Sequence, residues 1–391
     1  MKRIILVLNY IAALFLLTSY LAAVVSPAVF WPIALIGLLY PLLLLLNILF
    51  VAYWILRRQK YFWISVVFIA VGWTHHSRII HWNKTKDGTE AELRPAGSKF
   101  KLMSYNVRLF DLYNWRSDKN KVTRDKIFDF IKSESADVLL LQEFFVDDTK
   151  YFRTLDTMLL FLDTRNYHVE YTTSLRGNNH WGIATFSRFP IMNRGKVEFS
   201  EKSNNICIYT DIVVNKDTLR VYNSHLASIH FNYEEYDLIQ KIGGVGYEGQ
   251  SRDSSGKLGN SEQIKGISDE DVSVIDVSLK MVGRLKRAFV KRAKQAEQIA
   301  EHIAKSPYKN IHAGDFNDTP TSYTYGILVK DRVDAFVNSG NGLGSTYSGK
   351  LPSYRIDYIL HDAGLSSGDF KTITSNELSD HYPLSCWFTI N

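Results

Sequence analysis

Hydrophobic side chains are concentrated in the N-terminal part of this chain, whereas later positions mix hydrophobic and charged residues. Residues 4–73 are almost free of acidic side chains, and their one basic cluster is Arg57, Arg58 and Lys60. From about residue 83 onward, charged and apolar positions mix as they do in a water-soluble domain. The pattern therefore predicts two physically different regions, an apolar N-terminal region and a soluble domain that follows it.

Three apolar runs, at residues 4–25, 30–56 and 61–80, predict about three transmembrane helices within residues 1–82. A helix of roughly 20 apolar residues is long enough to cross a hydrocarbon core of about 30 Å. The third run is the weakest of the three, because its apolar part ends at Trp73.

The apolar runs have two other interpretations. The first run could be a cleaved signal peptide, since Lys2 and Arg3 precede it and small residues follow, but it is longer than such a segment needs to be. All three runs could instead form a buried helical subdomain, but core helices are usually shorter. We therefore expect an integral protein of the cytoplasmic, or inner, membrane.

The basic residues predict how these helices are oriented. Lys2, Arg3 and the short loop 57–60 carry the positive charges that usually face the cytoplasm. The third helix would then leave on the opposite side, and the large domain would be periplasmic or external. This orientation reverses if the third run does not span the membrane.

The soluble region predicts an α/β fold. Residues 83–98 are polar, contain Gly88, Pro95 and Gly97, and predict a linker before one domain at 99–391. Runs of β-branched and aromatic residues predict strands, and apolar periodicity predicts helices. The expected strands are 100–107, 137–142, 182–187, 206–214, 219–224, 309–313, 355–360 and 382–389, and the expected helices are 120–132, 149–162 and a long one ending near residue 305. Neighbouring strands separated by helices favour a layered sandwich over a doubly wound sheet.

Residues 240–271 differ in composition from the rest of the soluble domain. They are rich in Gly, Ser and charged residues and poor in apolar ones, which predicts a flexible insertion. The glycine cluster at 243–246 follows no strand and leads to no Gly-Lys-Ser/Thr sequence, so it does not indicate a nucleotide loop. A basic helical segment comes next, and it is either a solvated face or a surface for anionic lipid or a polyanion; its cations are Arg284, Lys286, Arg287, Lys291, Arg292 and Lys294.

Charge and cysteine content add little to this picture. The formal net charge of +6 and the pI near 9.0 suit an anionic partner, but many proteins without one are equally basic. Cys207 and Cys386 are the only cysteines, and both lie in apolar strand-like runs, which predicts two buried thiols rather than a disulfide.

Polar side chains stand at the ends of several predicted strands. Asn106 ends the first strand, and Glu143 directly follows the apolar run of the next. A carboxylate at the end of a buried strand is costly unless it is paired or binds a cation. His225 ends a third strand, and Asp315 and Asn317 stand at alternate positions after a fourth, so both side chains can point the same way.

Asp357, Asp380 and His381 complete this set of carboxylates, amides and imidazoles, which contains no thiolate and no phosphate-binding glycine loop. Oxygen ligands of this kind suit Mg²⁺ or Mn²⁺, whereas zinc prefers more histidine or cysteine. The set is therefore typical of phosphoryl chemistry on a hard cation.

Seven short motifs occur in the order found in the endonuclease/exonuclease/phosphatase superfamily, and the chain resembles that superfamily from about residue 100 to residue 391. They are SYNVR at 104–108, LLQE at 140–143, GIATFSRFP at 182–190, NSHL at 223–226, GDFN at 314–317, RIDYIL at 355–360 and SDHYP at 379–383. The superfamily includes DNase I-like nucleases, exonuclease III-like repair enzymes, neutral sphingomyelinases and inositol polyphosphate 5-phosphatases. The resemblance implies a four-layered α-β-β-α sandwich, here preceded by transmembrane helices.

The resemblance also implies a role for each site residue. Glu143 would be the principal Mg²⁺ ligand, with Asn106 and Asp380 nearby. Asp315 would orient or deprotonate the attacking water, and Asn317 would hold that aspartate and the phosphate. His225 and His381 would donate hydrogen bonds to phosphate oxygens, and Asp357 would orient His381.

The resemblance leaves the substrate open. The sequence departs from the inositol 5-phosphatase pattern, because Asp318-Thr319-Pro320 follows GDFN and no Trp-x-Asp-Arg segment appears near the end. A phosphodiesterase acting on phospholipid headgroups and a membrane-tethered nuclease acting on DNA or RNA both remain, as does a non-catalytic membrane scaffold that retains only the fold. Neither this choice nor the oligomeric state follows from the sequence.

Overall fold

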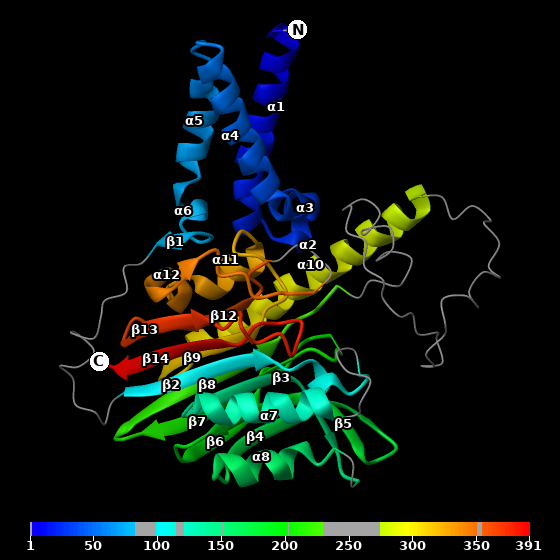
Figure 1. The fold of residues 1–391 in the computed structure, drawn as a ribbon, viewed down its shortest axis with the longest axis vertical. Helices are drawn as coiled ribbons and strands as arrows, with labels where there is room; N and C mark the ends of the chain where they lie inside the picture. The colour runs from blue at the N-terminus through cyan, green and yellow to red at the C-terminus, as the bar shows by residue number, and fades with distance from the viewer. Residues whose placement is uncertain are drawn as a thin grey trace. The chain divides into compact units, whose positions relative to one another are not determined.

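The computed structural model describes residues 2–82, 99–114, 121–149, 152–201, 203–229, 274–349 and 354–391. The predicted linker 83–98 and the predicted insertion 240–271 lie outside these residues. The chain divides into two compact units, of which the larger comprises residues 1–227 and 290–391 and the smaller residues 228–289. The larger unit contains both the N-terminal helices and the two sheets described below (Figure 1).

The N-terminal region is helical, as the apolar runs predict. The first run forms α1 (Lys2–Tyr20) and η1 (Leu21–Ala23), which together are long and apolar enough to cross a membrane. The second run is broken into α2 (Pro27–Phe30), α3 (Pro32–Leu38) and α4 (Tyr40–Leu56), with a bend of 60° between α3 and α4. The third run forms α5 (Phe62–Val71), which is shorter than a span, and α6 (Trp73–His76).

Buried polar side chains connect these helices. Asn9 of α1 donates to the hydroxyl of Ser65 in α5 (2.7 Å), and Ser65 donates to Asn47 of α4 (2.8 Å). The indole N–H of Trp54 donates to the side-chain oxygen of Asn9 (2.9 Å). These buried hydrogen bonds connect α1, α4 and α5 to one another.

Two mixed sheets of six strands form the centre of the soluble domain. The first has the order β13-β14-β2-β3-β5-β4, with the bounds Leu365–Thr372, Leu384–Ile390, Lys99–Asn106, Val138–Asp147, Asn179–Ser187 and Asn166–Leu175. The second has the order β10-β12-β9-β8-β7-β6, with the bounds Val333–Asp334, Asp357–His361, Lys309–Asp315, Asp217–His225, Ile206–Val214 and Ile191–Lys196. A short pair, β1 (His81–Trp82) and β11 (Asn341–Gly342), joins the end of the helical region to the domain.

Side-chain alternation along the strands explains the four layers. Leu102 and Leu140 point into the core between the two sheets, whereas their neighbours Met103 and Leu139 point outward, beneath α7 (Val122–Glu134) and α8 (Thr154–Leu162). The outer face of the second sheet packs against α11 (Tyr323–Val329) and the C-terminal part of α10 (Val274–Ala304). This is the α-β-β-α sandwich that the resemblance implies, and Figure 1 shows its layers.

All eight predicted strands correspond to strands of the structure, with shifts of a few residues at their ends. The sequence analysis missed β4, β6 and β13, whose side chains are largely half-buried or exposed and so lack a continuous apolar signal. It also missed the short helices α11 and α12 (Ala335–Ser339). Cys207 and Cys386 are free and buried, as predicted.

Candidate active site

Strand direction brings the predicted site residues to one edge of the sandwich. β2 and β3 are parallel and their pairing ends at Asn106 and Gln142, so Asn106 and Glu143 lie next to each other where this pairing stops. β8 and β9 are also parallel, and their last residues, His225 and Asp315, are paired across the ladder. β12 runs antiparallel to β9, so its first residue, Asp357, is paired with Asp315 at the same edge.

Glu143 stands at an irregularity within β3. The pairing of β3 with β5 shifts register between Leu141 and Phe144, and Glu143 has a positive φ of 51°. A bulge re-aims the side chain that it contains, and a left-handed backbone is costly for a residue other than glycine. The side chain of Glu143 therefore departs from the regular alternation of side chains along β3. Its Oε1 lies 3.3 Å from the side-chain nitrogen of Asn106.

Asn106 is buried and joins the two sheets. Its Nδ2 donates to Oε1 of Glu143 and, at 3.0 Å, to Oδ2 of Asp315. Its Oδ1 accepts a hydrogen bond from the backbone N–H of Arg108 at 3.1 Å. An amide oxygen has two lone pairs, so Oδ1 can accept this bond and still contact a cation.

Asp315 is buried at the point where β8 and β9 approach most closely. The preceding residue, Gly314, has a φ of 135°, and a Cβ at this position would overlap the backbone of Ser224. Burial raises the pKa of Asp315, the charge of Asp357 adds to this effect, and His381 and His225 oppose it. The side chain is thus a carboxylate whose environment favours a nearby cation or a bound proton.

His225 faces both carboxylates without a direct hydrogen bond. Its Nε2 lies 3.8 Å from Oε1 of Glu143 and 3.7 Å from Oδ2 of Asp315. Among the described residues this buried nitrogen has no hydrogen-bond partner. A buried polar atom without a partner is a common sign of a missing ligand.

His381 and Asp357 form a buried pair beside Asp315. Nδ1 of His381 lies 2.9 Å from Oδ2 of Asp357, and its Nε2 lies 3.7 Å from Oδ2 of Asp315. Burial lowers the pKa of His381, but Asp357 and Asp315 outweigh this effect and raise it well above its usual value. Ser379 holds the loop in place, because its hydroxyl donates to the backbone oxygen of Asn106 (2.8 Å).

The remaining two predicted residues, Asn317 and Asp380, lie at the rim of this cluster. The backbone N–H of Asn317 donates to Oδ1 of Asp315 (2.9 Å), whereas its side-chain nitrogen donates to the backbone oxygen of Leu226 (3.1 Å). Asn317 therefore contacts Asp315 through its backbone rather than its side chain. Asp380 forms an ion pair with Arg108 at 3.4 Å.

The family of this protein follows from its match to a family model. The family model described as "Endonuclease/Exonuclease/phosphatase family" matches residues 103–381, more than half of the chain. The chain belongs to the endonuclease/exonuclease/phosphatase family. Its members are metal-dependent hydrolases of phosphate esters, which confirms the prediction of a metal-dependent phosphoesterase. A second model, described only as a domain of unknown function, matches residues 2–79.

Solved structures of the same family resemble the chain at low identity. An endonuclease/exonuclease/phosphatase from Beutenbergia cavernae is 13% identical with a TM-score of 0.48, over 75% of this chain and 72% of the other. The human Nocturnin catalytic domain with bound sulfate is 15% identical with a TM-score of 0.48, over 75% and 95%. The family protein from Bacteroides vulgatus is 12% identical with a TM-score of 0.49, over 75% and 99%. No curated protein matches the chain.

The residues present fit the divalent cation on which this family depends. Oε1 of Glu143 lies 3.8 Å from the unpartnered nitrogen of His225 and 3.3 Å from the side-chain nitrogen of Asn106, whose Oδ1 faces the backbone N–H of Arg108. Carboxylate and amide oxygens are a donor set for a hard cation rather than for zinc. Asp315, Asp357 and His381 form a second possible group, with ligand atoms within 4.8 Å of one another. Asp357 and His381 already bond to each other in this group, so Glu143 and Asn106 are the better candidates for ligands.

Two side chains at the site were not predicted. Arg108 begins a turn in which four successive residues, Arg108 to Asp111, have positive φ values between 47° and 56°. Such a left-handed turn is unusual for residues other than glycine. The one signal in the sequence for a role of Arg108 was its positive charge, two positions after Asn106. The ring of Tyr347 contacts the imidazole of His381 edge-on, with centroids 5.3 Å apart, and nothing in its sequence context indicates this contact.

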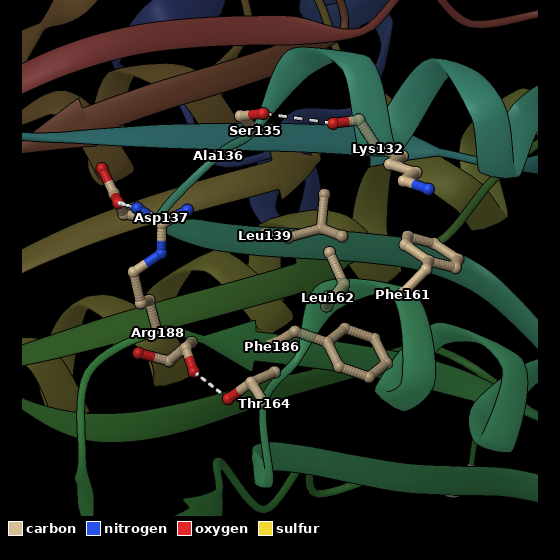
Figure 2. Close-up of a pocket in the computed structure, with 11 residues that line it drawn as sticks. Lys132, Ser135, Ala136, Asp137, Leu139, Phe161, Leu162, Thr164, Phe186 and Arg188 are labelled. Atoms are coloured by element: carbon tan, nitrogen blue, oxygen red, sulfur yellow. Dashed lines mark hydrogen bonds and ion pairs between the residues drawn. The ribbon is translucent and has the colours of Figure 1, made fainter.

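A separate small cavity of about 80 Å³ lies away from this cluster. Figure 2 shows its lining residues, which come from the ends of α7, α8 and β5, the start of β3 and the segments next to them. Arg188 closes one side through an ion pair with Asp137 (2.7 Å). Glu143 stands toward the other end of β3, so the cavity is not part of the site.

Proposed function

We propose that this protein is a membrane-anchored, Mg²⁺-dependent phosphoesterase that hydrolyses phosphodiester or phosphomonoester bonds by in-line attack of an activated water. The observation that carries the proposal is the convergence of Asn106, His225 and His381 on Oδ2 of Asp315. Glu143 lies beside this group, next to Asn106 and His225. Family membership supplies the reaction class, and this geometry supplies the roles proposed below.

In the proposed mechanism Asp315 orients the attacking water and accepts its proton. The backbone N–H of Asn317 fixes the other oxygen of this carboxylate at 2.9 Å. The water oxygen forms a bond to phosphorus as the bond to the leaving oxygen breaks. The leaving oxygen takes up a proton from solvent and Asp315 later releases its proton to solvent, so a diester yields a phosphomonoester and an alcohol. Burial of Asp315 supports this role, because a raised pKa makes a carboxylate a better base.

Two imidazoles are placed to stabilise the charge that develops on phosphate oxygens. Asp357 accepts the hydrogen bond from Nδ1 of His381 and so fixes the ring with Nε2 toward Asp315. His225 presents its unpartnered Nε2 from the opposite sheet. Donors that are fixed before reaction stabilise the transition state without a cost of reorganisation.

Glu143, Asn106 and Asp380 are the proposed ligands of Mg²⁺, for which Mn²⁺ can substitute. When bound, the cation would act as a Lewis acid that neutralises charge on the transferring phosphoryl group. Asp380 would need to exchange or share its ion pair with Arg108 to serve as a ligand.

Membrane anchoring is the second part of the proposal. α1 with η1 has the length and apolarity of a membrane span, and many large apolar side chains of α1, α4 and α5 are exposed, including Ile4, Leu42 and Trp63. Exposed apolar surface on this scale is unusual for a soluble domain. The ammonium of Lys2 contacts Gln59 at 2.8 Å, so the two basic segments lie at one end of the helices. This supports a cytoplasmic location for them and a periplasmic or external location for the catalytic domain.

Two substrate classes are compatible with the proposed reaction. Anchoring would keep the site close to phospholipid headgroups, which favours a lipid or headgroup phosphodiesterase. A membrane-tethered endonuclease acting on DNA or RNA is the alternative.

A substrate panel tests the proposal directly. The detergent-solubilised full chain is incubated with Mg²⁺ and sphingomyelin, plasmid DNA, RNA or bis-p-nitrophenyl phosphate, with and without chelator. Chelator-sensitive cleavage of a lipid is expected, and cleavage confined to DNA or RNA would select the nuclease. No cleavage of any substrate with either Mg²⁺ or Mn²⁺ would overturn the proposal.

A further inference from the structure

We infer that the N-terminal helical region is a positioning element of the active site rather than a passive tether. The inference rests on the proposed function and adds a role for residues 2–82. It follows from where the helices contact the catalytic domain. These contacts fall on the segments that carry Asp315 and Asp357, and Asp357 is the hydrogen-bond partner of His381.

The first contact is at the bend between α3 and α4. A helix leaves its last carbonyl oxygens without partners within the helix, and the bend of 60° ends α3 at Leu38. The hydroxyl of Thr321 donates to the backbone oxygen of Gly37 (3.2 Å), and the hydroxyl of Tyr354 donates to that of Leu38 (3.5 Å). Catalytic-domain side chains therefore cap the broken helix.

The second contact is between η1 and α11, which lie side by side at the lower end of α1 (Figure 1). The backbone oxygen of Ala23 approaches Gly326 so closely that a Cβ at Gly326 would overlap it. The absence of a side chain at this one position of α11 is therefore what allows the approach.

The third contact joins the turn after α6 to the start of β12. The guanidinium of Arg355 is buried, donates to the backbone oxygen of Arg78 (2.8 Å) and pairs with Asp334 (2.7 Å). A buried guanidinium requires such partners, so the turn after α6 completes the environment of Arg355. Arg355 is separated from Asp357 by one residue.

These contact residues are linked to the catalytic side chains by short hydrogen-bonded paths. The backbone oxygen of Tyr354 accepts from the N–H groups of Thr346 (3.0 Å) and Tyr347 (3.1 Å). The hydroxyl of Thr346 accepts from the N–H of Asp357 (3.1 Å), and the ring of Tyr347 lies against His381. The residues that hold α3 thus also hold the Asp357–His381 pair.

Thr321 is linked to Asp315 along the chain itself. It lies in the turn that follows β9, and the backbone oxygen of Asp318 in that turn accepts from the hydroxyl of Tyr358 (2.8 Å). The same hydroxyl donates to the backbone oxygen of Arg355 (2.8 Å). The two catalytic segments and the helical region therefore form one connected assembly.

A tether and a positioning element predict different results with a small, water-soluble substrate. A tether only brings the enzyme to its substrate, so moving the helices should leave hydrolysis of bis-p-nitrophenyl phosphate unchanged. A positioning element sets the geometry of the site, and a displacement of about 1 Å can reduce turnover by up to ~10²-fold.

The test uses the full chain in detergent and the substitution Gly326→Ala, which places a methyl group against the carbonyl of Ala23. We expect kcat for bis-p-nitrophenyl phosphate to fall by about tenfold or more while KM stays within about twofold. Gly368→Ala is the matched control, because a Cβ there meets nothing within 4 Å. It should retain the parental kcat.

A second pair of variants tests the same inference if Gly326→Ala does not fold. Thr321→Val removes the donor to Gly37, and Thr321→Ser keeps it. A lower kcat in the valine variant and a near-parental kcat in the serine variant, with both variants folded by thermal melting, support positioning. Parental kcat in Thr321→Val overturns the inference, and so does parental kcat in a folded Gly326→Ala. An inactive parent chain would instead contradict the proposed function, and the inference with it.

Discussion

Among single residues, Asp315 is the one on which the site converges. Its Oδ2 lies 3.0 Å from Nδ2 of Asn106 and 3.7 Å from Nε2 of both His225 and His381. These groups come from both sheets, so small changes at either sheet reach the same atom. A carboxylate in this position can accept the proton of an attacking water while the two imidazoles face the phosphate oxygens, as the proposed mechanism requires.

Asp357→Asn tests whether the orientation of His381 matters. The amide cannot balance an imidazolium or fix its tautomer, so we expect kcat to fall by ~10²-fold or more, in the range usual for lost acid–base function. Asp369→Asn is the control, because Asp369 forms an exposed ion pair with Lys371. Rates for bis-p-nitrophenyl phosphate are measured together with the melting temperature. Equal rates for Asp357→Asn and the parent would refute the role of the pair.

Sequence reasoning could find the residues that end strands but not those that reach the site from loops. Glu143 and Asp315 stood out because a carboxylate directly after a buried apolar run needs an explanation. Tyr347 lies in a segment rich in Gly and Ser, and its contact with His381 depends on how distant segments pack. Asn317 was expected to hold Asp315 and the phosphate, and its backbone N–H donates to Oδ1 of Asp315.

At the scale of elements, a buried ion pair ties α10 to the turn after β9. The guanidinium of Arg292 pairs with Asp318 (3.0 Å) and donates to the backbone oxygen of Ala227 (2.8 Å). The sequence analysis placed Arg292 in a basic segment that was either a solvated face or an anion-binding surface. The structure corrects this for Arg292, which is 1% exposed because it faces the domain and not the solvent.

Arg292→Ala should therefore destabilise the fold. Removing one partner of a buried pair typically costs about 3–5 kcal/mol, because the other charge stays buried and unpaired. Chemical unfolding in detergent measures the change. Lys305→Ala removes one member of an exposed pair with Glu301 and should change stability little. Similar unfolding curves for both variants would contradict this reading of α10.

The polar contacts among the N-terminal helices predict a second stability effect. Asn47 donates to the backbone oxygen of Ala12 (3.1 Å) and accepts from Ser65 (2.8 Å), so Asn47→Leu removes hydrogen bonds between helices. Each such bond contributes ~0.6–2 kcal/mol in a membrane protein. We expect a lower melting temperature in detergent, whereas Leu49→Ala, at an exposed position, should have little effect. A melting temperature for Asn47→Leu equal to that of the parent would show that these contacts are not stabilising.

The elements differ in how far their sequences specify them. The core strands were predicted from runs of β-branched and aromatic residues between turn residues. The bend between α3 and α4 was not, because residues 30–56 read as one continuous apolar run. Pro41 has no N–H for the carbonyl of Gly37, which breaks the helix at this point, and the hydroxyl of Thr321 donates to the carbonyl that is left free.

At the scale of the whole molecule, the proposal requires that the protein be integral to a membrane. After expression, it should stay in the membrane fraction through alkaline carbonate washing, which removes peripheral proteins. Protease added outside intact spheroplasts should cut the catalytic domain, because the basic N-terminal end is expected to face the cytoplasm. Release by carbonate would contradict anchoring, and protection from protease would reverse the proposed orientation.

The central claim is that the residues gathered around Asp315 hydrolyse phosphate esters with the help of a divalent cation. The most direct test compares the parent chain with Glu143→Gln for hydrolysis of bis-p-nitrophenyl phosphate and for Mn²⁺ binding followed by electron paramagnetic resonance. We predict chelator-sensitive turnover and bound Mn²⁺ in the parent, with turnover lower by ~10²-fold or more and Mn²⁺ binding weakened in a folded Glu143→Gln. Equal turnover and equal Mn²⁺ binding in the two proteins would contradict the account.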